Sequence, residues 1–571
     1  MVYDKEKTLA SNSGNEANGL KILQIIEEES KHPIDVMNNL LFSTLKDNEN
    51  TEYGKKYNFS EIKTIKDYQK NVPIVTYEEI KPYIERMANG EKDILTVYPF
   101  NHMNETSATS GAAKMIPMTD KQSQIYLKYN NAAIYGLLGK FVNPEWKQGR
   151  ALSTSEGCYR TLPSGITVGA ASSKMAEYLK GGEEELNSLL GVMYTTPVEA
   201  TISNNNADRI YLQARFAMMD KNMTGMITAF MSQIVHIMNY IGKNYRVIID
   251  DIRTGTISDS IDMPDNIRES ILKRLVPMPE RADELDEIFK NGPETKFATR
   301  IWPNLYYVAG VGGASFTVYD DYLNERFFDR KVDRIYSGVT SSEGLWSFPV
   351  ELNTKSSMIA VGSAFMEFLP VTAGDDFSQI KTLEEIEIGK TYELIITNVN
   401  GFYRYRMSDA VTVTGFYNNT PLVEFAYRVN NTINLDVEKT TETALKEAVD
   451  GAMKELGKKY FDFCVYPDAL HNAPRYIFLI EGYDEMDNVS DKQVSELITK
   501  YLYISNPEYK FSVEVTKRLE APIAYFLQPQ TFNLYRDMKI LKGSSASQLK
   551  PVKVIKNEQV KQFFMTLKRE Q

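Results

Sequence analysis

Cysteine and histidine are scarce in this sequence, with two cysteines and four histidines among 571 residues. Cys158 and Cys464 lie far apart and belong to no CxxC spacing, so we expect no disulfide framework and a reduced, cytoplasmic location. The histidines are scattered along the chain: His32, His102, His236 and His471. Their spacing leaves a zinc site or a histidine-based catalytic triad without support.

The sequence also lacks an excess of basic residues and a long apolar run. Its formal net charge is -11, so we expect no nucleic-acid partner, which would require a basic face. The longest apolar stretch, Met223–Gly242, contains Gln233, His236 and Asn239, which argues against a membrane span. We expect it to be a buried helix that ends at Gly242, with His236 hydrogen-bonded in the core. The N-terminus lacks the apolar core of a signal peptide, so we expect a soluble protein without a membrane partner.

The length and the hydrophobic patterns predict a mixed α/β (α+β) protein of at least two domains. Two amphipathic helices are expected between residues 19 and 47, the second with Ile34, Met37, Leu41 and Leu45 on one face. The middle of the chain, to about residue 380, mixes short β-rich runs such as 246–250 with helical stretches such as 268–276. That mixture predicts a large α/β or α+β domain.

From Thr391 the side-chain character alternates at period two, which predicts an antiparallel meander with turns at Asn400-Gly401, Ser408-Asp409 and 418–421. A helix over 443–456, strands over 461–466 and 475–483, a helix after Ser490, a strand over 510–515 and a last helix ending near Gly543 follow. These elements predict a compact α+β unit. We place the boundary at Arg428, which gives domains 1–428 and 429–571.

Four short segments carry the chemistry. The first, Thr106–Lys114 ("TSATSGAAK"), combines small residues, hydroxyls and one lysine, which suits the close approach of a phosphate. Its candidate phosphate contacts are Thr109, Ser110 and Lys114; the alternative is a plain surface loop. The second, Gly310–Ser315 ("GVGGAS"), permits a tight turn and close contact with a planar ligand, or is an ordinary β-turn.

The third segment, Tyr336–Trp346 ("YSGVTSSEGLW"), places three hydroxyl residues before Glu343. That carboxylate is a candidate to orient a magnesium ion that carries triphosphate oxygens. The alternative is a helix cap, with Ser341 or Ser342 at the N-cap and Glu343 in the first turn.

The fourth segment, 403–415 ("YRYRMSDAVTVTG"), places Asp409 where one strand turns into another. A carboxylate there suits a ribose, because it accepts hydrogen bonds from both hydroxyls; aspartate is also common in turns for local reasons. Arg404 and Arg406 share a face of the strand, which is a candidate ion-paired or solvated face.

The order of these segments resembles that of the adenylate-forming enzymes. More specifically, the chain resembles the acyl-acid amido synthetases, known in plants as the auxin-responsive Gretchen Hagen family, and we expect a bacterial member. The segments that carry this resemblance are "NTEYGKKYNF", "VPIVTYEEIKPYIERMANGE", "TSATSGAAKMIPMT", "IWPNLYYV", "TSSEG", "MEFLPV", "GFYRYRMSDAVTVTGFYN" and "EKTTE".

The resemblance implies ATP-dependent activation of a carboxylic acid as its acyl-adenylate, followed by transfer to an amine, usually an amino acid. It implies a large N-terminal adenylate-forming domain and a small mobile C-terminal domain. It puts these residues at the site: Thr109, Ser110 and Lys114 at the triphosphate, Gly312 and Gly313 beside the adenylate, Thr340, Ser341, Ser342 and Glu343 at the nucleotide and magnesium, Asp409 at the ribose, Arg428 at the hinge, and Lys550 as the late lysine that moves with the C-terminal domain.

Two positions depart from the family pattern, because Ala108 and Ser408 stand where the family usually has glycine. The acyl pocket is expected to draw on residues 158–173 and the helix from Met223. One rival activity is acyl transfer to coenzyme A or a carrier thiol, and a rival of another class is a nucleotide-binding regulatory pseudoenzyme. A monomer is favoured.

Overall fold

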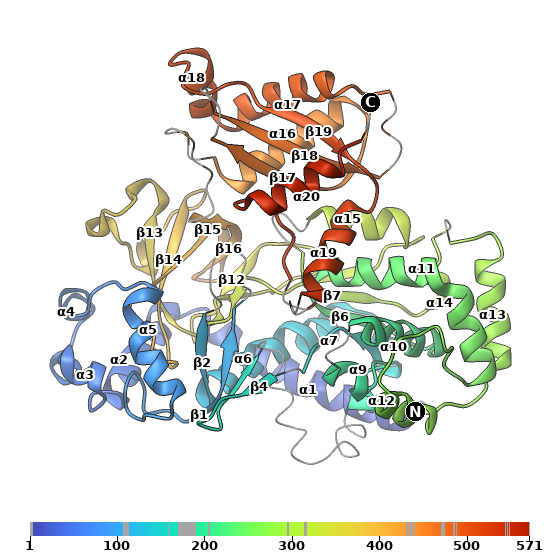
Figure 1. Ribbon diagram of the computed structural model, residues 1–571. Helices are drawn as coiled ribbons and strands as arrows, with labels where there is room; N and C mark the ends of the chain where they lie inside the picture. The colour runs from blue at the N-terminus through green and yellow to red at the C-terminus, as the bar shows by residue number, and fades with distance from the viewer. Residues whose placement is uncertain are drawn as a thin grey trace.

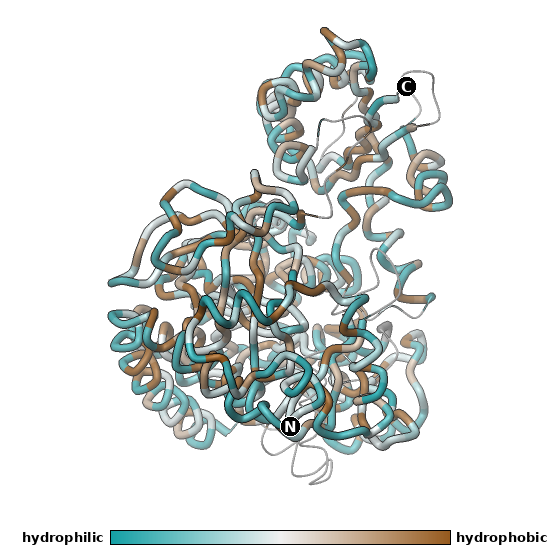
Figure 2. The backbone as a smooth tube through the Cα atoms, turned by 90° about the vertical axis from the view of Figure 1, so that its left-hand side faces the viewer, coloured by the Kyte–Doolittle hydropathy of each residue, from teal (hydrophilic) through white to brown (hydrophobic). Residues whose placement is uncertain are grey.

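The computed structural model describes residues 4–569 except for 107–113, 158, 170–189, 204–205, 294–295, 313–316, 430–432, 434, 436–437, 439, 470–473, 484–485, 487, 543, 545 and 547–548. It has a large N-terminal domain, blue to yellow in Figure 1, and a C-terminal domain, orange to red, that stands above it. The view turned by 90° in Figure 2 shows the same separation. The predicted division into a large and a smaller mixed domain is therefore confirmed.

The first 141 residues of the chain are mostly helical. The helices are α1 (Lys5–Glu29), α2 (Pro33–Asp47), α3 (Glu52–Lys56), α4 (Ile65–Asn71), α5 (Tyr77–Ala88), α6 (Asp120–Asn131) and α7 (Leu137–Phe141). The two predicted helices are α1 and α2, but α1 begins well before residue 19, because the Asp4 side chain caps it by accepting from the backbone N–H of Lys7. On α2, Met37, Leu41 and Leu45 are buried as predicted, whereas Ile34 is exposed.

A four-stranded parallel sheet lies in the middle of the N-terminal domain. Its order is β3 (Ala151–Ser153), β6 (Gly225–Phe230), β7 (Tyr307–Val311) and β8 (Asp333–Tyr336). The helices around it are α9 (Val198–Ile202), α10 (Asn206–Met219), α11 (Met231–Thr254), α12 (Asp265–Leu272), α13 (Pro279–Phe289), α14 (Ala298–Ile301) and α15 (Thr317–Arg326). Ligands of parallel sheets bind outside the carboxyl ends of the strands, which here are the ends of β7 and β8.

Two predictions for this region are wrong. The stretch 223–242 begins as strand β6, and α11 continues through Gly242 until Gly255, whose φ of 71° ends it in the left-handed conformation. The run 246–250 is also part of α11, not a strand. Its Ile248 and Ile249 are buried with Ile252 on one face of the helix, so tertiary packing outweighs their β preference.

The antiparallel meander forms most of a six-stranded sheet. Its order is β11 (Ser347–Phe348), β12 (Ser357–Ile359), β16 (Thr420–Arg428), β15 (Tyr405–Tyr417), β14 (Thr391–Thr397) and β13 (Phe365–Pro370). The predicted turn at Gly401 is present, with φ 93°. The predicted turn at Ser408-Asp409 is wrong, because both residues lie inside β15, where Asp409 pairs with Arg428 of β16.

Two smaller sheets complete the N-terminal domain. One has the order β2 (Met115–Thr119), β1 (Phe100–Glu105), β5 (Thr167–Gly169) and β4 (Tyr159–Thr161), and the other pairs β9 (Thr340–Ser341) with β10 (Gly344–Leu345). Among the helices of the described residues, none has the length and apolar character needed to cross a membrane.

The C-terminal domain packs helices on a three-stranded sheet of β17 (Tyr460–Asp468), β18 (Arg475–Gly482) and β19 (Ile523–Leu527). The helices are α16 (Glu442–Glu455), α17 (Asp491–Ser505), α18 (Pro507–Glu514), α19 (Thr531–Leu541) and α20 (Glu558–Thr566). The predicted strand over 510–515 is wrong. Asn506 caps a helix there by accepting from the N–H of Tyr509, and Pro507 occupies its first position.

The two domains meet at α11 and α15 on one side and at α19 and β17 on the other (Figure 1). His236 of α11 is largely buried, and its Nε2 lies 3.7 Å from Asp537 Oδ1 of α19. Burial and the charge of Arg536 lower the pKa of His236 to about 4, whereas Asp537 acts in the opposite direction. The predicted core histidine is therefore part of the contact between the domains.

The first prediction concerns this histidine and pH. An unfolded histidine has a pKa of about 6.5, so between pH 6.5 and 4 the unfolded chain binds a proton that the folded chain does not. The free energy of unfolding should fall as the pH drops through this window, by roughly 2 kcal/mol at pH 5. Urea unfolding from pH 7.5 to 5 should show this loss in the wild type and a smaller loss in His236→Gln. The exposed His32 provides the control: His32→Gln should keep the wild-type dependence, and equal slopes in wild type and His236→Gln contradict the account.

Candidate active site

Glu343 lies at the tip of a two-residue β-hairpin. Gly344 pairs with Ser341 and Leu345 with Thr340, so Ser342 and Glu343 form the turn between β9 and β10. No helix begins here, and the helix-cap alternative for Glu343 is therefore wrong. The residue is 8% exposed, so the turn holds its carboxylate largely inside the protein.

Side-chain amides from strand β1 and from the loop after β14 hold this turn in place. Asn398 and Asn400 donate to the carbonyl oxygen of Glu343 at 3.0 and 3.2 Å, and Asn104 donates to that of Ser342 at 2.8 Å. The Ser341 hydroxyl donates to Glu343 Oε2 at 2.7 Å. Since both the backbone and one carboxylate oxygen have partners, the other oxygen of Glu343 has a defined direction.

Tyr405 connects that second oxygen to Lys114. Its hydroxyl donates to Glu343 Oε1 at 3.3 Å and accepts from Lys114 Nζ at 3.4 Å. Lys114 Nζ also lies 5.0 Å from the centre of the Tyr77 ring. Burial, and then the charge of Glu343, raise the pKa of Tyr405, so its hydroxyl keeps its proton. The Tyr405 hydroxyl thus lies between the ammonium group of Lys114 and the carboxylate of Glu343 and is hydrogen-bonded to both.

Sequence reasoning missed Tyr405. Its period-two spacing with Tyr403 marks both as buried residues of a strand, and both are 1% exposed. Nothing in the local sequence distinguishes the tyrosine that packs from the one that reaches the site, because Glu343 lies 62 residues earlier.

Asp409 forms an ion pair across the strands with Arg428. Arg428 Nε and Nη2 donate to the two carboxylate oxygens at 2.8 and 3.2 Å. Asp409 is 5% exposed, whereas the Arg428 side chain is 40% exposed at the end of β16. Asp409 raises the pKa of Arg428. Each carboxylate oxygen retains a second lone pair, with which it can accept one further hydrogen bond.

Ser408 gives β15 a kink immediately before Asp409. Its φ is 64°, in the left-handed region that costs a residue with a Cβ about 1–2 kcal/mol. The pairing of β14 with β15 shifts register around it, between the pairs Ile395–Arg406 and Glu393–Ala410. Glycine adopts this conformation without strain, and Ser408 adopts it nonetheless.

The end of β7 brings the backbone close to its neighbour. A Cβ on Gly312 would lie 2.6 Å from the Tyr336 ring, so only glycine fits there without movement. The backbone at Gly312 therefore lies unusually close to the neighbouring strand β8. Thr109, Ser110, Gly313 and residues 158 and 170–173 of the expected acyl pocket lie outside the described residues.

Lys550 belongs to the C-terminal domain, and its side chain lies next to the parallel sheet of the N-terminal domain. Its Nζ lies 6.0 Å from the centre of the Phe230 ring at the end of β6. The residue is solvent-exposed, yet the surrounding protein and then Arg428 lower its pKa, while Asp409, Glu442 and Glu343 act in the opposite direction. The structure thus brings Lys550 of the C-terminal domain to the end of β6, at the carboxyl edge of the parallel sheet.

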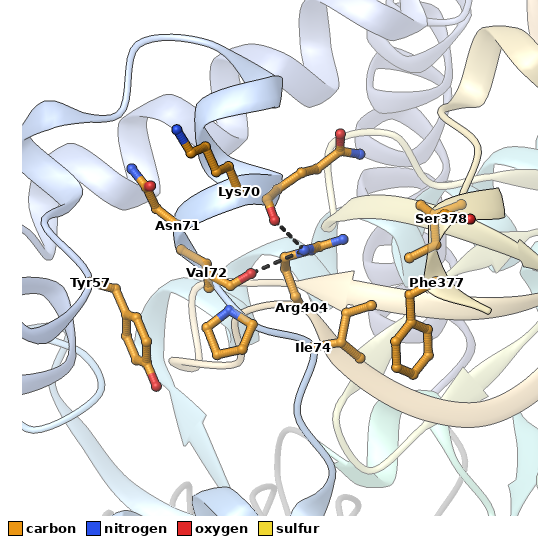
Figure 3. Close-up of a pocket in the computed structure, with 11 residues that line it drawn as sticks. Tyr57, Lys70, Asn71, Val72, Ile74, Phe377, Ser378 and Arg404 are labelled. Atoms are coloured by element: carbon orange, nitrogen blue, oxygen red, sulfur yellow. Dashed lines mark hydrogen bonds between the residues drawn. The ribbon is translucent and has the colours of Figure 1, made fainter. Parts of the chain in front are cut away.

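A hollow of about 730 Å³ lies at the edge of the first domain and is lined by other residues than those described above (Figure 3). Arg404 lies on it, and its Nη1 donates to the carbonyl oxygens of Gln69 and Val72 at 2.8 and 3.0 Å. Its Nε and Nη2 bind the fully buried Glu367. Arg404 therefore joins α4 to the antiparallel sheet, which makes it a structural ion pair, and none of the predicted site residues lines this hollow.

Three family models match the chain in order: the GH3 family N-terminal domain over residues 22–332, the central domain over 357–428 and the C-terminal domain over 443–559. The first match alone covers more than half of the chain. The chain belongs to the GH3 family.

Similar proteins and structures agree with this assignment. Indole-3-acetic acid-amido synthetase GH3.3 of Arabidopsis thaliana is 26% identical, over 93% of this chain and 91% of that protein. The 4-substituted benzoates-glutamate ligase GH3.12 of the same plant is 28% identical, over 93% and 94%. The structure of the GH3.15 acyl acid amido synthetase matches with a TM-score of 0.83 at 22% identity, over 96% of both chains. A 2-hydroxyisobutyryl-CoA ligase with a bound adenylate matches with a TM-score of 0.53 at 10% identity, over 95% and 92%. The structural matches show that this chain shares the fold of these enzymes.

The second prediction concerns the kink at Ser408. Ser408→Gly should keep activity and stability within about 1 kcal/mol of the wild type, because relief of strain offsets the added freedom of the unfolded chain. Ser408→Val should lose at least about 2 kcal/mol, since a β-branched residue is poorly tolerated at positive φ. Thr412→Val, in the extended part of the same strand, is the matched control for the loss of a hydroxyl. Thermal unfolding measures all three, and a valine at 408 as harmless as one at 412 contradicts the prediction.

Proposed function

We propose that this chain is an ATP-dependent, AMP-forming ligase that activates a carboxylic acid as its acyl-adenylate and transfers the acyl group to an amine or amino acid, forming an amide. The observation that carries the proposal is the position of Lys550, which belongs to the C-terminal domain but lies with its Nζ 6.0 Å from the Phe230 ring at the end of β6, in a chain of the GH3 family. We propose a domain boundary at Arg428, where β16 ends. The relatives' names, which describe amide-forming ligases, support the reaction class.

In the first step, a carboxylate oxygen of the acid attacks the α-phosphorus of ATP. The bond to the bridging oxygen breaks, and pyrophosphate leaves with the electron pair. Negative charge builds up on the phosphoryl oxygens, so cations held nearby stabilise the transition state. We assign Lys114 and Lys550 to this role, together with the phosphate contacts Thr109 and Ser110.

The remaining assignments concern the nucleoside. Asp409 accepts hydrogen bonds from the ribose hydroxyls, and Arg428 lies beside it at the hinge. The backbone at Gly312 and Gly313 approaches the adenylate. The hairpin residues Thr340, Ser341 and Ser342 contact the nucleotide and hold Glu343.

Glu343 is the proposed magnesium ligand. In the described part of the chain, no group of three or more histidine, cysteine or acidic residues could hold a metal ion. A single carboxylate nevertheless fits magnesium, which ordinarily takes one or two protein carboxylates and completes its shell with waters and substrate phosphates. When bound, the ion would neutralise charge on the triphosphate. Glu343 Oε1, 3.3 Å from Tyr405 Oη, is the oxygen we assign to this contact.

In the second step, a deprotonated amine attacks the acyl-adenylate carbonyl, and AMP leaves. The rival activity, acyl transfer to a thiol, differs from the proposed one only in this second step. It remains an alternative because the chain shares its fold with a CoA ligase. A nucleotide-binding pseudoenzyme is the rival of another class. Cytoplasmic location, bacterial origin and a monomeric state remain predictions.

One experiment separates these activities. The protein, ATP and magnesium are incubated with a pooled panel of carboxylic acids and amino acids, with and without coenzyme A, and products are identified by mass spectrometry. Amides together with AMP are the expected result. Thioesters alone would favour the rival ligase, and absence of both, with no acid-dependent pyrophosphate exchange, would favour the pseudoenzyme.

The third prediction separates the two steps through Lys550. Its cationic end offsets charge that develops as pyrophosphate leaves, so Lys550→Ala should slow acid-dependent pyrophosphate exchange about 10- to 100-fold. With synthetic acyl-adenylate and amine supplied, the same variant should form amide at close to the wild-type rate. Lys542→Ala, at an exposed position beyond α19, is the control and should change neither rate. Equal losses in both steps, or none in either, contradict the assignment.

A further inference from the structure

One buried carboxylate at the domain junction has partners from both domains. Asp462 of β17 is fully buried. The hydroxyl of Tyr319, on α15 of the N-terminal domain, donates to its Oδ2 at 2.5 Å. Lys553, in the C-terminal segment that follows Lys550, forms an ion pair with its Oδ1, and the N–H of Phe463 donates to the same oxygen at 2.7 Å.

Lys553 fixes the segment that carries Lys550. It is 5% exposed, and its Nζ lies 4.7 Å from the centre of the Phe463 ring. Its carbonyl oxygen accepts from the N–H of Val465, and the N–H of Ile555 donates to the carbonyl oxygen of Val465, both at 2.8 Å. Three residues of chain span about 10 Å at most, so the anchor at Lys553 limits where Lys550 can lie.

On the other side, α15 is tied to the sheet that carries the site. Asp320, the neighbour of Tyr319, accepts from Arg334 and Tyr336 of β8, both at 2.5 Å. Tyr322 of the same helix packs its ring 5.3 Å from that of Phe461 on β17. The chain enters α15 from the segment after Gly312. Tyr319 therefore connects the parallel sheet, through α15, to Asp462 of the C-terminal domain.

We propose that Tyr319, Asp462 and Lys553 form a latch that sets the position of Lys550 over the nucleotide site, with Tyr319 and Lys553 as positioning residues. The role of Lys550 itself rests on the proposed function. A buried carboxylate suits a latch because losing one partner leaves a charge only partly compensated. The latch is complete when α15 and β17 are in contact, because Tyr319 and Lys553 then both bind Asp462. When α15 and β17 separate, the hydrogen bond from Tyr319 is lost.

The decisive variant is Tyr319→Phe, which removes one hydroxyl and keeps the ring. It should slow acid-dependent pyrophosphate exchange about 10-fold or more, the range for losing a hydrogen bond to a charged group. It should leave amide formation from supplied acyl-adenylate within about twofold of the wild type. A hydroxyl that only stabilised the fold would affect both steps alike, and that result, or an unchanged exchange rate, overturns the proposal.

Tyr211→Phe is the matched control. Tyr211 also donates from a buried hydroxyl to a buried aspartate, Asp251, at 2.6 Å, but both residues belong to the N-terminal domain. This variant should lose stability and keep the wild-type ratio of the two half-reactions. A changed ratio in Tyr211→Phe would show that the loss of any such bond alters it, which also overturns the proposal.

Lys553 provides a second test by rescue. Lys553→Met should reduce exchange as Tyr319→Phe does, and Lys553→Arg, which restores the charge, should recover part of it. If Lys553→Met does not fold, Tyr319→Phe alone decides. Folded methionine and arginine variants with equal exchange rates contradict the role of this ion pair.

Domain geometry can be measured without any activity. Dyes on Leu127→Cys of α6 and Ile504→Cys of α17, both at exposed positions, report the distance between the domains by energy transfer, with Cys158 changed to serine and Cys464 buried. Tyr319→Phe should broaden the distance distribution, and Tyr211→Phe should not. A wild type without exchange would refute the proposed function, while unchanged distances in Tyr319→Phe would refute the latch, so the two failures are distinguishable.

Discussion

The proposed site places two carboxylates and the polyphosphate of a nucleotide in one small volume. Glu343 and Asp409 are both largely buried, and each adds a negative charge where the nucleotide would lie. Lys114 and Arg428 balance them from within the N-terminal domain. Lys550 adds a third cation to this balanced set of charges. In the proposed function, binding of a triphosphate is therefore favoured when the C-terminal domain places Lys550 near these groups.

The hydrogen bonds around the Glu343 turn and the backbone conformation of Ser408 fix the orientation of the side chains at the proposed site. Three asparagine amides and one serine hydroxyl hold the Glu343 turn, so that Glu343 Oε1 accepts from Tyr405, which in turn accepts from Lys114. The kink at Ser408 turns Asp409 towards Arg428 across the strands. Preorganisation of this kind limits the rearrangement required when charge develops during the reaction.

Much of the fold was predictable because the patterns were strong. The α1–α2 pair, the meander and the helix at 442–455 follow the expected periodicities. The predictions failed where packing or capping outweighed local preference, as in α11, whose isoleucines are buried on a helix, and in α18, which Asn506 and Pro507 begin. Lys114, Glu343, Asp409 and Lys550 were predicted from motifs, which identify chemical groups. Tyr405 and the latch at Asp462 were not, since each depends on residues far apart in the sequence meeting in the fold.

The central claim is that the acid is activated on the α-phosphorus of ATP. It is tested most directly by an acid labelled with ¹⁸O in both carboxylate oxygens, allowed to react with ATP and an amine under single-turnover conditions. The account predicts one ¹⁸O atom in AMP and one in the amide, because the attacking oxygen stays on phosphorus when the amine displaces the nucleotide. Appearance of the label in inorganic phosphate together with ADP, or unlabelled AMP, would contradict it.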